Sequence, residues 1–500
     1  MSISVPKQLA PSTRGGVTRP VVTRFLPEPS GYLHIGHLRA ILLSQAVANK
    51  YEGRMRIRFD DTNPETEEGV FEDAILEDLQ TLGINVDSTP VTHTSDYFDD
   101  LIDHCTDLIQ RGLAYVDLST GDQITTQRAN LRPSPSRDQT VDQNMELWNK
   151  MLSAPTSTVV RLKMDYRSPN GNLRDPVAYR HVAAPHHRTK DAYYVYPSYD
   201  FACPIVDYME GVTHVLRGIE YVDRKDQYKW VLKMVGFHTP SIFCFGRIRF
   251  TGTDLSKRKI KQLVNDNTMH GFDDPRLPTI RGVLSQGMSI DALKNYFLGQ
   301  GFSTRSIETG WGKIWAVNRK IIDKKAVRMM AVPRDSHQVC YIKTPTRGKP
   351  TEPTEIELTS IPVSGVNPSL GIRELTVSPS ILVNCYDMEQ IKNGDGVIVI
   401  HIGGAKYNRL GSDKSLHHQF TINDDHNFGK KDYRICWVPV ARHVEVTVDT
   451  VDRMEINQSH LLVDSWFSTL PLNTWIQIYQ MGYYVKTSDT TMISVPTGRG

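Results

Sequence analysis

RFLPEPSGYLHIGH, from Arg24 to His37, is the stretch that decides the fold, because two histidines and a glycine stand where a strand gives way to a helix. Val21 to Phe25 predicts a short buried strand, and Pro27 to Tyr32 predicts a turn. The following residues, Ile35 to Tyr51, predict a helix with an apolar side made of Ile41, Leu42, Ala46 and Val47.

The start of that helix suits a phosphate group. Unpaired backbone N–H groups and a partial positive charge gather at a helix N-terminus. His34 and His37 can add hydrogen-bond donors to the same oxyanion, and Gly36 lets a nucleotide approach the backbone closely. We therefore predict a nucleotide site here. Two alternatives stay open, namely that the histidines cap the helix or that they bind a metal.

A second stretch, Asp254-Leu-Ser-Lys-Arg-Lys259, follows a strand expected from Ser241 to Phe250. A run of Lys and Arg is by itself usually a solvated surface. Together the two stretches resemble the HIGH motif and the mobile KMSKS loop of class I aminoacyl-tRNA synthetases. The resemblance implies that Lys257 neutralises charge on the phosphates of ATP as pyrophosphate leaves, and this stabilises the transition state electrostatically.

Composition indicates a soluble globular chain of several domains. Its 500 residues exceed one typical core, 39% are hydrophobic and 23% are charged, and no apolar run reaches the length of a membrane span. The six cysteines form no CxxC pair, which argues against structural zinc and a disulfide framework and favours a reducing, cytoplasmic compartment. The first twenty residues are basic without an acid, and we expect them to be disordered rather than a transit peptide.

The net charge of only +2 means that a nucleic acid must be bound by local basic surface. One basic cluster comprises Arg247, Arg249, Lys257, Arg258, Lys259 and Lys261. A second comprises Lys313, Arg319, Lys320, Lys324, Lys325 and Arg328, in an expected helix with Trp315, Ile322 and Val327 on its buried side. A solvated charged helix is the alternative for the second cluster.

The order of patterns predicts an interrupted α/β domain, then helices, then strands. A strand expected at Met55 to Phe59 completes a parallel βαβ start. A helix at Leu101 to Gly112, a polar segment and short strands interrupt the pattern until about Val195. After Val332, period-two alternation such as Gly396 to His401 predicts β-barrels or a sandwich, and similar segments run from His443 to Val448 and from Trp475 to Tyr479.

Several phrases resemble one subgroup of class I, the glutamyl- and glutaminyl-tRNA synthetases of the eukaryotic and archaeal type. They are RFLPEPSGYLHIGH, RIRFDDTNPE from Arg56, YPSYDFACPIVD from Tyr196, EGVTHVLRGIEY from Glu210, LSKRK from Leu255 and DDPRLPTIRG from Asp273. The resemblance implies a multidomain α/β plus all-β chain. Its expected segments are a disordered start at 1–20, a Rossmann-like catalytic domain at 21–100 and 196–250, an acceptor-end-binding insertion at 101–195, the KMSKS loop and a helical stem-contact region at 251–331, and a pair of anticodon-binding β-barrels at 332–500.

Arg217 distinguishes glutamate from glutamine in this family pattern. Glutamyl enzymes carry an arginine at this place, whereas glutaminyl enzymes carry a small uncharged residue. A guanidinium forms two parallel hydrogen bonds to a carboxylate, and an unsatisfied buried charge costs about 3–5 kcal/mol. The pair Ala202-Cys203 is also glutamyl-like. The alternative is that Arg217 only pairs with Glu220 or Asp223.

The resemblance carries further residues over by position. The glutamate site is expected to comprise Arg24, Asp60, Tyr199, Cys203 and Arg217, with Asp60 holding the substrate ammonium. The ATP site is expected to comprise Glu28, Pro29, Ser30, His34, Gly36, His37, Leu38, Arg39, Gly218, Arg247, Ile248, Leu255, Ser256 and Lys257. His34, His37 and Lys257 are expected to be catalytic, and no protein-bound metal is expected. Leu255 stands where Met is usual, and Thr253-Asp254 precedes it in place of an apolar residue.

The expected reaction has two steps. Glutamate attacks the α-phosphate of ATP·Mg²⁺ to give glutamyl-adenylate, and the terminal ribose hydroxyl of tRNA(Glu) then accepts the glutamyl group. The partners are L-glutamate and tRNA(Glu), with no membrane, and any partners in a synthetase complex are unspecified. Three alternatives stay open: a glutaminyl enzyme, a tRNA-modifying paralogue, which would lack the C-terminal region, and a catalytically inactive RNA-binding relative.

Overall fold

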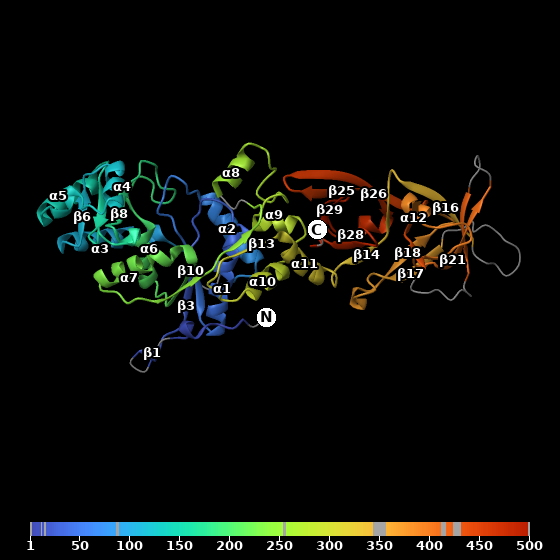
Figure 1. The fold of residues 1–500 in the computed structure, drawn as a ribbon, viewed down its shortest axis with the longest axis horizontal. Helices are drawn as coiled ribbons and strands as arrows, with labels where there is room; N and C mark the ends of the chain where they lie inside the picture. Colours follow the sequence, from blue (N-terminus) through green and yellow to red (C-terminus); the bar gives the residue numbers. More distant parts are fainter. Residues whose placement is uncertain are drawn as a thin grey trace. The chain divides into compact units, whose positions relative to one another are not determined.

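The computed structural model describes residues 3–11, 13–14, 17–86, 90–253, 257–343, 357–411, 417–423 and 432–498 (Figure 1). The chain forms two compact units. The first comprises Met1–Phe272, Pro278–Ile280 and Lys294–Thr309, and the second comprises Asp273–Leu277, Arg281–Leu293 and Gly310–Gly500. Within the described ranges, every helix is too short or too polar to cross a membrane.

A parallel sheet organises the first unit. β3 (Val22–Phe25) pairs with β4 (Arg54–Phe59), and β4 pairs with β5 (Thr92–His93). β10 (His214–Gly218) pairs with β11 (Ser241–Phe245), and the backbone N–H of Thr213 donates to the Val22 carbonyl, which places β10 beside β3. The order β5-β4-β3-β10-β11 is that of a Rossmann-like sheet, so the expected catalytic fold is confirmed.

Helices and 3-10 turns connect these strands. They include η2 (Ile35–His37), α1 (Leu38–Lys50), α2 (Gly69–Thr81), α6 (Tyr199–Met209) and α7 (Lys225–Met234). Leu43 and Val47 of α1 are buried in one cluster with Val21, Leu216 and Phe243. The apolar spacing of α1 therefore packs the helix against the sheet, as the sequence predicts, although its first turn is a separate 3-10 turn.

An antiparallel sheet interrupts the first unit between β5 and α6. Its strands, in order, are β6 (Ala114–Asp117), β7 (Val159–Leu162), β8 (Val177–His181) and β9 (Val195–Pro197). Figure 1 shows this sheet in cyan and green beside α3 (Phe98–Gln110), α4 (Gly121–Ala129) and α5 (Val141–Ser153). Trp148 and Tyr179 belong to the core that α3, α5 and the sheet share. The interruption lies where the sequence pattern changes.

One feature of the first unit differs from the sequence prediction. The strand expected from Ser241 to Phe250 is divided into β11 and β12 (Ile248–Phe250), and β12 pairs with β13 (Ile307–Thr309). Gly246 lies at the division, where an added Cβ would fall 2.0 Å from the Arg305 carbonyl oxygen, so only glycine fits. Near the start of the described chain, Leu9 is fully buried in one cluster with Val21 and Phe243.

The remaining elements before the C-terminal strands are short. They are η1 (Lys7–Leu9), β1 (Thr13–Arg14), β2 (Val17–Thr18), η3 (Thr94–Tyr97), η4 (Pro135–Asp138), η5 (Gly171–Leu173), η6 (Ile219–Arg224), α8 (Lys257–Asn265), α9 (Ile280–Ser285), α10 (Ile290–Gly299) and α11 (Trp311–Ile322). The expected basic helix therefore ends at Ile322, and Val327 belongs to a strand instead. Val327 pairs with Ile476 in a parallel strand ladder, so strand pairing replaces the helix there.

The second unit contains two nearly closed seven-stranded barrels. The first has the order β14 (Val327–Met329), β27 (Trp475–Ile478), β28 (Gly482–Lys486), β29 (Thr491–Val495), β25 (His443–Asp452), β26 (Glu455–Asp464) and β15 (Ala331–Pro333). Only Met330 separates β14 from β15, so the two edges of this sheet meet. Its core includes Val446, Ile476 and Met492.

The second barrel closes in the same way. Its order is β23 (Tyr433–Ile435), β20 (Gly396–Val399), β21 (Gly403–Leu410), β22 (His417–Ile422), β16 (His337–Lys343), β19 (Ser380–Asn384) and β24 (Trp437–Pro439). Only Cys436 separates β23 from β24. β17 (Glu357–Pro362), η7 (Pro368–Leu370), β18 (Ile372–Val377), α12 (Cys385–Glu389) and η8 (Ser465–Thr469) complete the unit. The alternation after Val332 thus forms the barrels that the sequence predicts.

Candidate active site

The two histidines of the opening stretch cap the turn that precedes α1. Nδ1 of His34 accepts from the Gly36 N–H at 3.0 Å, and Nδ1 of His37 accepts from the His34 N–H at 3.1 Å. Their rings stack with centroids 3.9 Å apart. Because Nδ1 accepts in both rings, the proton of each neutral imidazole is on Nε2. The capping alternative therefore describes these contacts, in which Nδ1 of each ring is the acceptor.

A cavity of about 790 Å³ lies beside this turn, wholly within the first unit. It is lined by residues of β3, η2, α1, α6, β10, β11 and β12, of the loops that follow them, and by Phe297 and Glu308. Eleven of the sequence-predicted site residues line it: Arg24, Glu28, His34, Gly36, His37, Arg39, Tyr199, Arg217, Gly218, Arg247 and Ile248. The fold thus brings together parts of the chain that are more than two hundred residues apart in sequence.

The other predicted residues lie outside the lining or outside the described part. Pro29, Ser30, Leu38, Asp60 and Cys203 do not line the cavity. Leu255 and Ser256 lie outside the described residues, and the structure describes only the backbone of Lys257, at the first position of α8.

Arg217 is a buried cation that lines this cavity and is 5% exposed. Its Nη2 donates to the hydroxyl of Tyr199 at 3.0 Å. Its guanidinium carbon lies 4.8 Å from the ring centroid of Tyr221 and 5.3 Å from that of Tyr228, so three tyrosines surround it. Its Nε is buried without a hydrogen-bond partner among the described residues.

The alternative partners of Arg217 do not pair with it in the part of the chain that the structure describes. Glu220 pairs instead with Arg247, with Oε1 2.6 Å from Nη2. Aromatic faces reduce the energy of a buried cation, but they do not supply the two-oxygen acceptor that a guanidinium prefers. The guanidinium of Arg217 therefore has no carboxylate partner among the described residues, and it can bind a carboxylate of a ligand in the cavity.

Arg24 differs from Arg217 because a carboxylate already holds it. Its Nε lies 3.3 Å from Oδ2 of Asp207, and its Nη1 donates to the Leu216 carbonyl at 3.1 Å. Asp207 also accepts from Arg58 at 2.7 Å and from the Tyr228 hydroxyl at 2.9 Å. Burial by itself would raise the pKa of Asp207, but the two arginines hold the pKa below its ordinary value. Asp207 is thus ionised and fixes the orientation of Arg24.

Asp60 follows β4 and is linked to the rim of the cavity through the backbone. Its N–H donates to the carbonyl of Pro27, a lining residue, at 2.9 Å. Its Oδ1 accepts from the Thr62 hydroxyl at 3.1 Å. Burial, and then repulsion by Asp61, raises the pKa of Asp60 to about 7. A bound cation would favour the ionised form of this carboxyl.

Sequence reasoning missed the groups that hold the two arginines. Tyr221 and Tyr228 contact Arg217, and Asp207 contacts Arg24. One signal was available for Asp207, because Tyr199, Cys203 and Asp207 are spaced by four residues and share one side of α6. Cys203 lies on the same side of α6, and its Sγ is 3.9 Å from Nη2 of Arg24.

Comparisons with known proteins agree on a family. Residues 20–324 match the family described as "tRNA synthetases class I (E and Q), catalytic domain". The chain is 37% identical over 511 residues to "Probable glutamate--tRNA ligase, cytoplasmic" of Schizosaccharomyces pombe, a match that covers 96% of this chain and 70% of the relative. It is 40% identical over 436 residues to "Glutamate--tRNA ligase, cytoplasmic" of Saccharomyces cerevisiae, covering 86% of this chain and 60% of the relative.

A solved structure is also similar. A glutamate-tRNA synthetase from Elizabethkingia anophelis has 17% sequence identity and a TM-score of 0.42, and the match covers 61% of this chain and 71% of that one. The chain spans between 60% and 70% of the length of the two yeast relatives.

Proposed function

The chain belongs to the glutamate and glutamine group of the class I tRNA synthetases, and from that membership we propose that it is a cytoplasmic glutamate–tRNA ligase. It activates L-glutamate with ATP and transfers the glutamyl group to the 3′ end of tRNA(Glu). Magnesium arrives with the nucleotide as part of the substrate.

The observation that carries the proposal is the buried, carboxylate-free Arg217. A substrate γ-carboxylate can accept from this guanidinium in the geometry that arginine prefers. The neutral amide of glutamine offers one acceptor oxygen and brings two N–H donors toward a cation, so it leaves the charge only partly satisfied. Breaking a buried charge pair costs about 3–5 kcal/mol, which is enough to discriminate between the two amino acids.

Arg24 supports the same assignment. Asp207 holds Arg24 with its guanidinium at the cavity wall, so an anionic substrate meets two fixed cations. Asp60, close to Pro27, supplies the opposite charge for the substrate ammonium. This arrangement of two cations and one acid is complementary to an amino acid with a carboxylate side chain.

The first chemical step is adenylate formation. An oxygen of the glutamate α-carboxylate attacks the α-phosphorus of ATP, and the bond from that phosphorus to the bridging oxygen breaks, so pyrophosphate leaves with the electron pair. His34 and His37 direct their Nε2–H groups toward the phosphate oxyanion, and Lys257 stabilises the charge that develops on the leaving group. These groups position and stabilise without forming a covalent intermediate.

The second step transfers the glutamyl group. The terminal ribose hydroxyl of the tRNA attacks the carbonyl carbon of the adenylate, loses its proton, and AMP leaves. The antiparallel sheet from β6 to β9 would guide the acceptor end toward the cavity, and the two barrels would read the anticodon by stacking and base-edge hydrogen bonds.

A charging assay tests the proposal. The full chain is incubated with ATP and with either glutamate or glutamine, and with tRNA(Glu) or tRNA(Gln). We expect glutamate to be attached to tRNA(Glu) and glutamine to be attached to neither. Attachment of glutamine would establish the glutaminyl alternative. No pyrophosphate exchange with either amino acid, in the presence of tRNA, would instead favour the inactive RNA-binding relative.

A further inference from the structure

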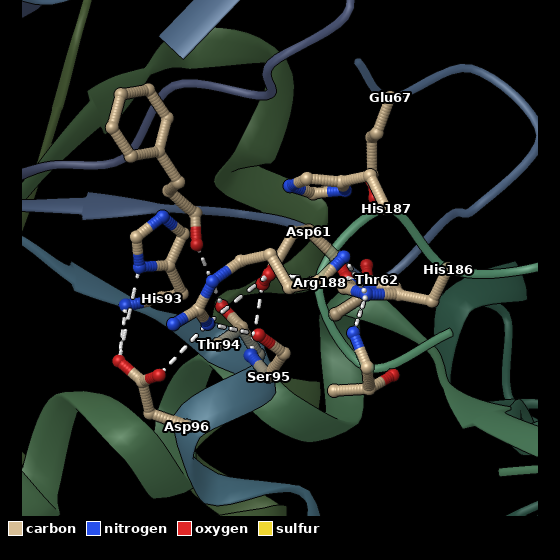
Figure 2. Close-up of polar contacts among 12 residues, drawn as sticks. Asp61, Thr62, Glu67, His93, Thr94, Ser95, Asp96, His186, His187 and Arg188 are labelled. Atoms are coloured by element: carbon tan, nitrogen blue, oxygen red, sulfur yellow. Dashed lines mark hydrogen bonds and ion pairs between the residues drawn. The ribbon is translucent and has the colours of Figure 1, made fainter. Parts of the chain in front are cut away.

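Glu67, His186 and His187 form a polar cluster outside the described cavity. Glu67 lies in the loop after β4, and the two histidines lie in the segment between β8 and β9. One ligand atom from each of the three side chains lies within 4.8 Å of those of the other two. Figure 2 shows the side chain of Glu67 extending toward His187.

Two donor atoms of this cluster are buried without a hydrogen-bond partner among the described residues. Glu67 is 5% exposed; its Oε1 accepts from the Asn63 N–H at 2.8 Å, and its Oε2 has no partner. Nδ1 of His187 is the second such atom. A buried polar atom without a partner costs about 1–3 kcal/mol, so this pair needs an explanation.

Glu72 determines which nitrogen of His187 carries the lone pair. Nε2 of His187 lies 2.7 Å from Oε1 of Glu72, so the neutral ring donates its proton to that carboxylate. Nδ1 is therefore the basic nitrogen. A carboxylate that accepts from one histidine nitrogen, while the other nitrogen faces a metal, is the arrangement that orients histidine ligands in metal sites.

His186 differs from His187, because both of its ring nitrogens make hydrogen bonds to the backbone. Nε2 donates to the Asp61 carbonyl at 2.8 Å, and Nδ1 accepts from the backbone N–H groups of Arg188 and Thr189 at 3.1 Å. Its ring stacks on that of His187 with centroids 4.8 Å apart. His186 thus packs against His187 and has no nitrogen left to bind a metal.

The segment that carries His187 is held in place. Nη1 of Arg188 lies 2.8 Å from Oδ1 of Asp96, and Figure 2 shows this contact beside the one from Arg188 to Ser95. Oε2 of Glu72 also binds Nε2 of His93 at 2.9 Å. The donor atoms are therefore preorganised on two segments that are far apart in sequence.

The surrounding charge favours a cation. The loop after β4 that carries Glu67 also carries Asp60 and Asp61, so further acidic side chains lie in the same loop. His187 is only partly buried, so an ion can reach the cluster from solvent.

We propose that Oε2 of Glu67 and Nδ1 of His187 bind a divalent transition-metal cation, zinc being the expected one, with water completing its coordination. One imidazole nitrogen and one carboxylate oxygen suit zinc, whereas magnesium and calcium prefer oxygen ligands alone. The lack of a CxxC pair, which argued against structural zinc, does not bear on this donor set. The ion would tie the loop that carries Asp60 to the segment between β8 and β9.

Binding of Zn²⁺ to the metal-free, untagged full chain tests this site by titration calorimetry. We expect one saturable site in the wild type, and at least a tenfold loss of affinity in both Glu67→Gln and His187→Gln. Glu72→Gln should cost about tenfold or more, because it removes the group that orients His187. Glu65→Gln is the matched control, since it removes an exposed acid two residues away, and its affinity should equal that of the wild type.

Co²⁺ spectra check the identity of the ligands. Cobalt bound at this site should show no thiolate charge-transfer absorption, because neither ligand is a cysteine. The proposal is overturned if the wild type lacks a saturable site, if thiolate absorption appears, or if His187→Gln binds zinc as tightly as the wild type. A thermal melt of each variant is recorded first, to establish that it is folded. Because His187 is only partly buried, His187→Gln tests the site even where Glu67→Gln fails to fold.

Discussion

Asp207 holds Arg24 in place: Oδ2 of the acid lies 3.3 Å from Nε of the arginine, and both side chains are at least 95% buried. Asp207 also pairs with Arg58, whose second partner is Glu210. A single carboxylate on α6 thus compensates two buried cations from neighbouring strands of the parallel sheet. Stability and substrate recognition are therefore coupled at this residue.

Asp207→Asn should destabilise the protein by about 3–5 kcal/mol, because it leaves Arg24 and Arg58 buried with one partner fewer. Urea unfolding monitored by circular dichroism measures the change. Asp200→Asn is the control: its ion pair with Arg224 is partly exposed, and its loss should cost about 0–1 kcal/mol. If the two variants unfold at the same urea concentration, Asp207 does not have the role assigned to it.

Arg217→Leu should abolish most glutamate activation, because the substrate carboxylate loses its bidentate partner in a buried cavity. ATP binding should be retained. The measurement is glutamate-dependent pyrophosphate exchange in the presence of tRNA, with Arg224→Leu as an exposed arginine control. Activity of Arg217→Leu within about threefold of the wild type, which corresponds to roughly 0.65 kcal/mol, would mean that the contact is wrong.

Glutamate binding should strengthen as the pH rises from 6 to 8. Burial raises the pKa of Asp60 to about 7, so at pH 6 this carboxyl is mostly protonated and cannot pair with the substrate ammonium. The ionised fraction increases about tenfold between these two pH values, and the Kd for glutamate should fall by the same factor. Calorimetry at each pH measures the Kd. Asp60→Asn should bind weakly with a flat profile, and a flat profile in the wild type would contradict the assignment.

Lys257→Ala should slow adenylate formation by about a hundredfold or more, since its charge acts mainly in the transition state. The affinity for glutamate should change little. Single-turnover kinetics separate the two effects. Lys259→Ala, which removes a charge from the same basic run, is the comparison, and its rate of adenylate formation should fall by less than about threefold. An unchanged chemical step together with weaker substrate binding would assign Lys257 to binding alone.

The sequence by itself determined the parts of the fold that depend on local pattern. The strand at Val22–Phe25 and the spacing of Ile41, Leu42 and Val47 in α1 follow from the sequence alone, because strand and helix periods are properties of neighbouring residues. Alternation after Val332 likewise predicts the barrel strands. Local pattern failed at Gly246 and Val327, where close approach to Arg305 and strand pairing with Ile476 decide the geometry.

Only the tertiary structure decided how the site is held. Asp207 is 183 residues from Arg24 in the chain, and Glu67 lies more than a hundred residues from His187, so no local period relates either pair. The family resemblance named eleven residues that line the cavity, but the surroundings of Arg217 depend on the packing of three tyrosines around it. The physical reason is that the energy of a buried charge depends on every group within a few ångströms, and the fold alone brings those groups together.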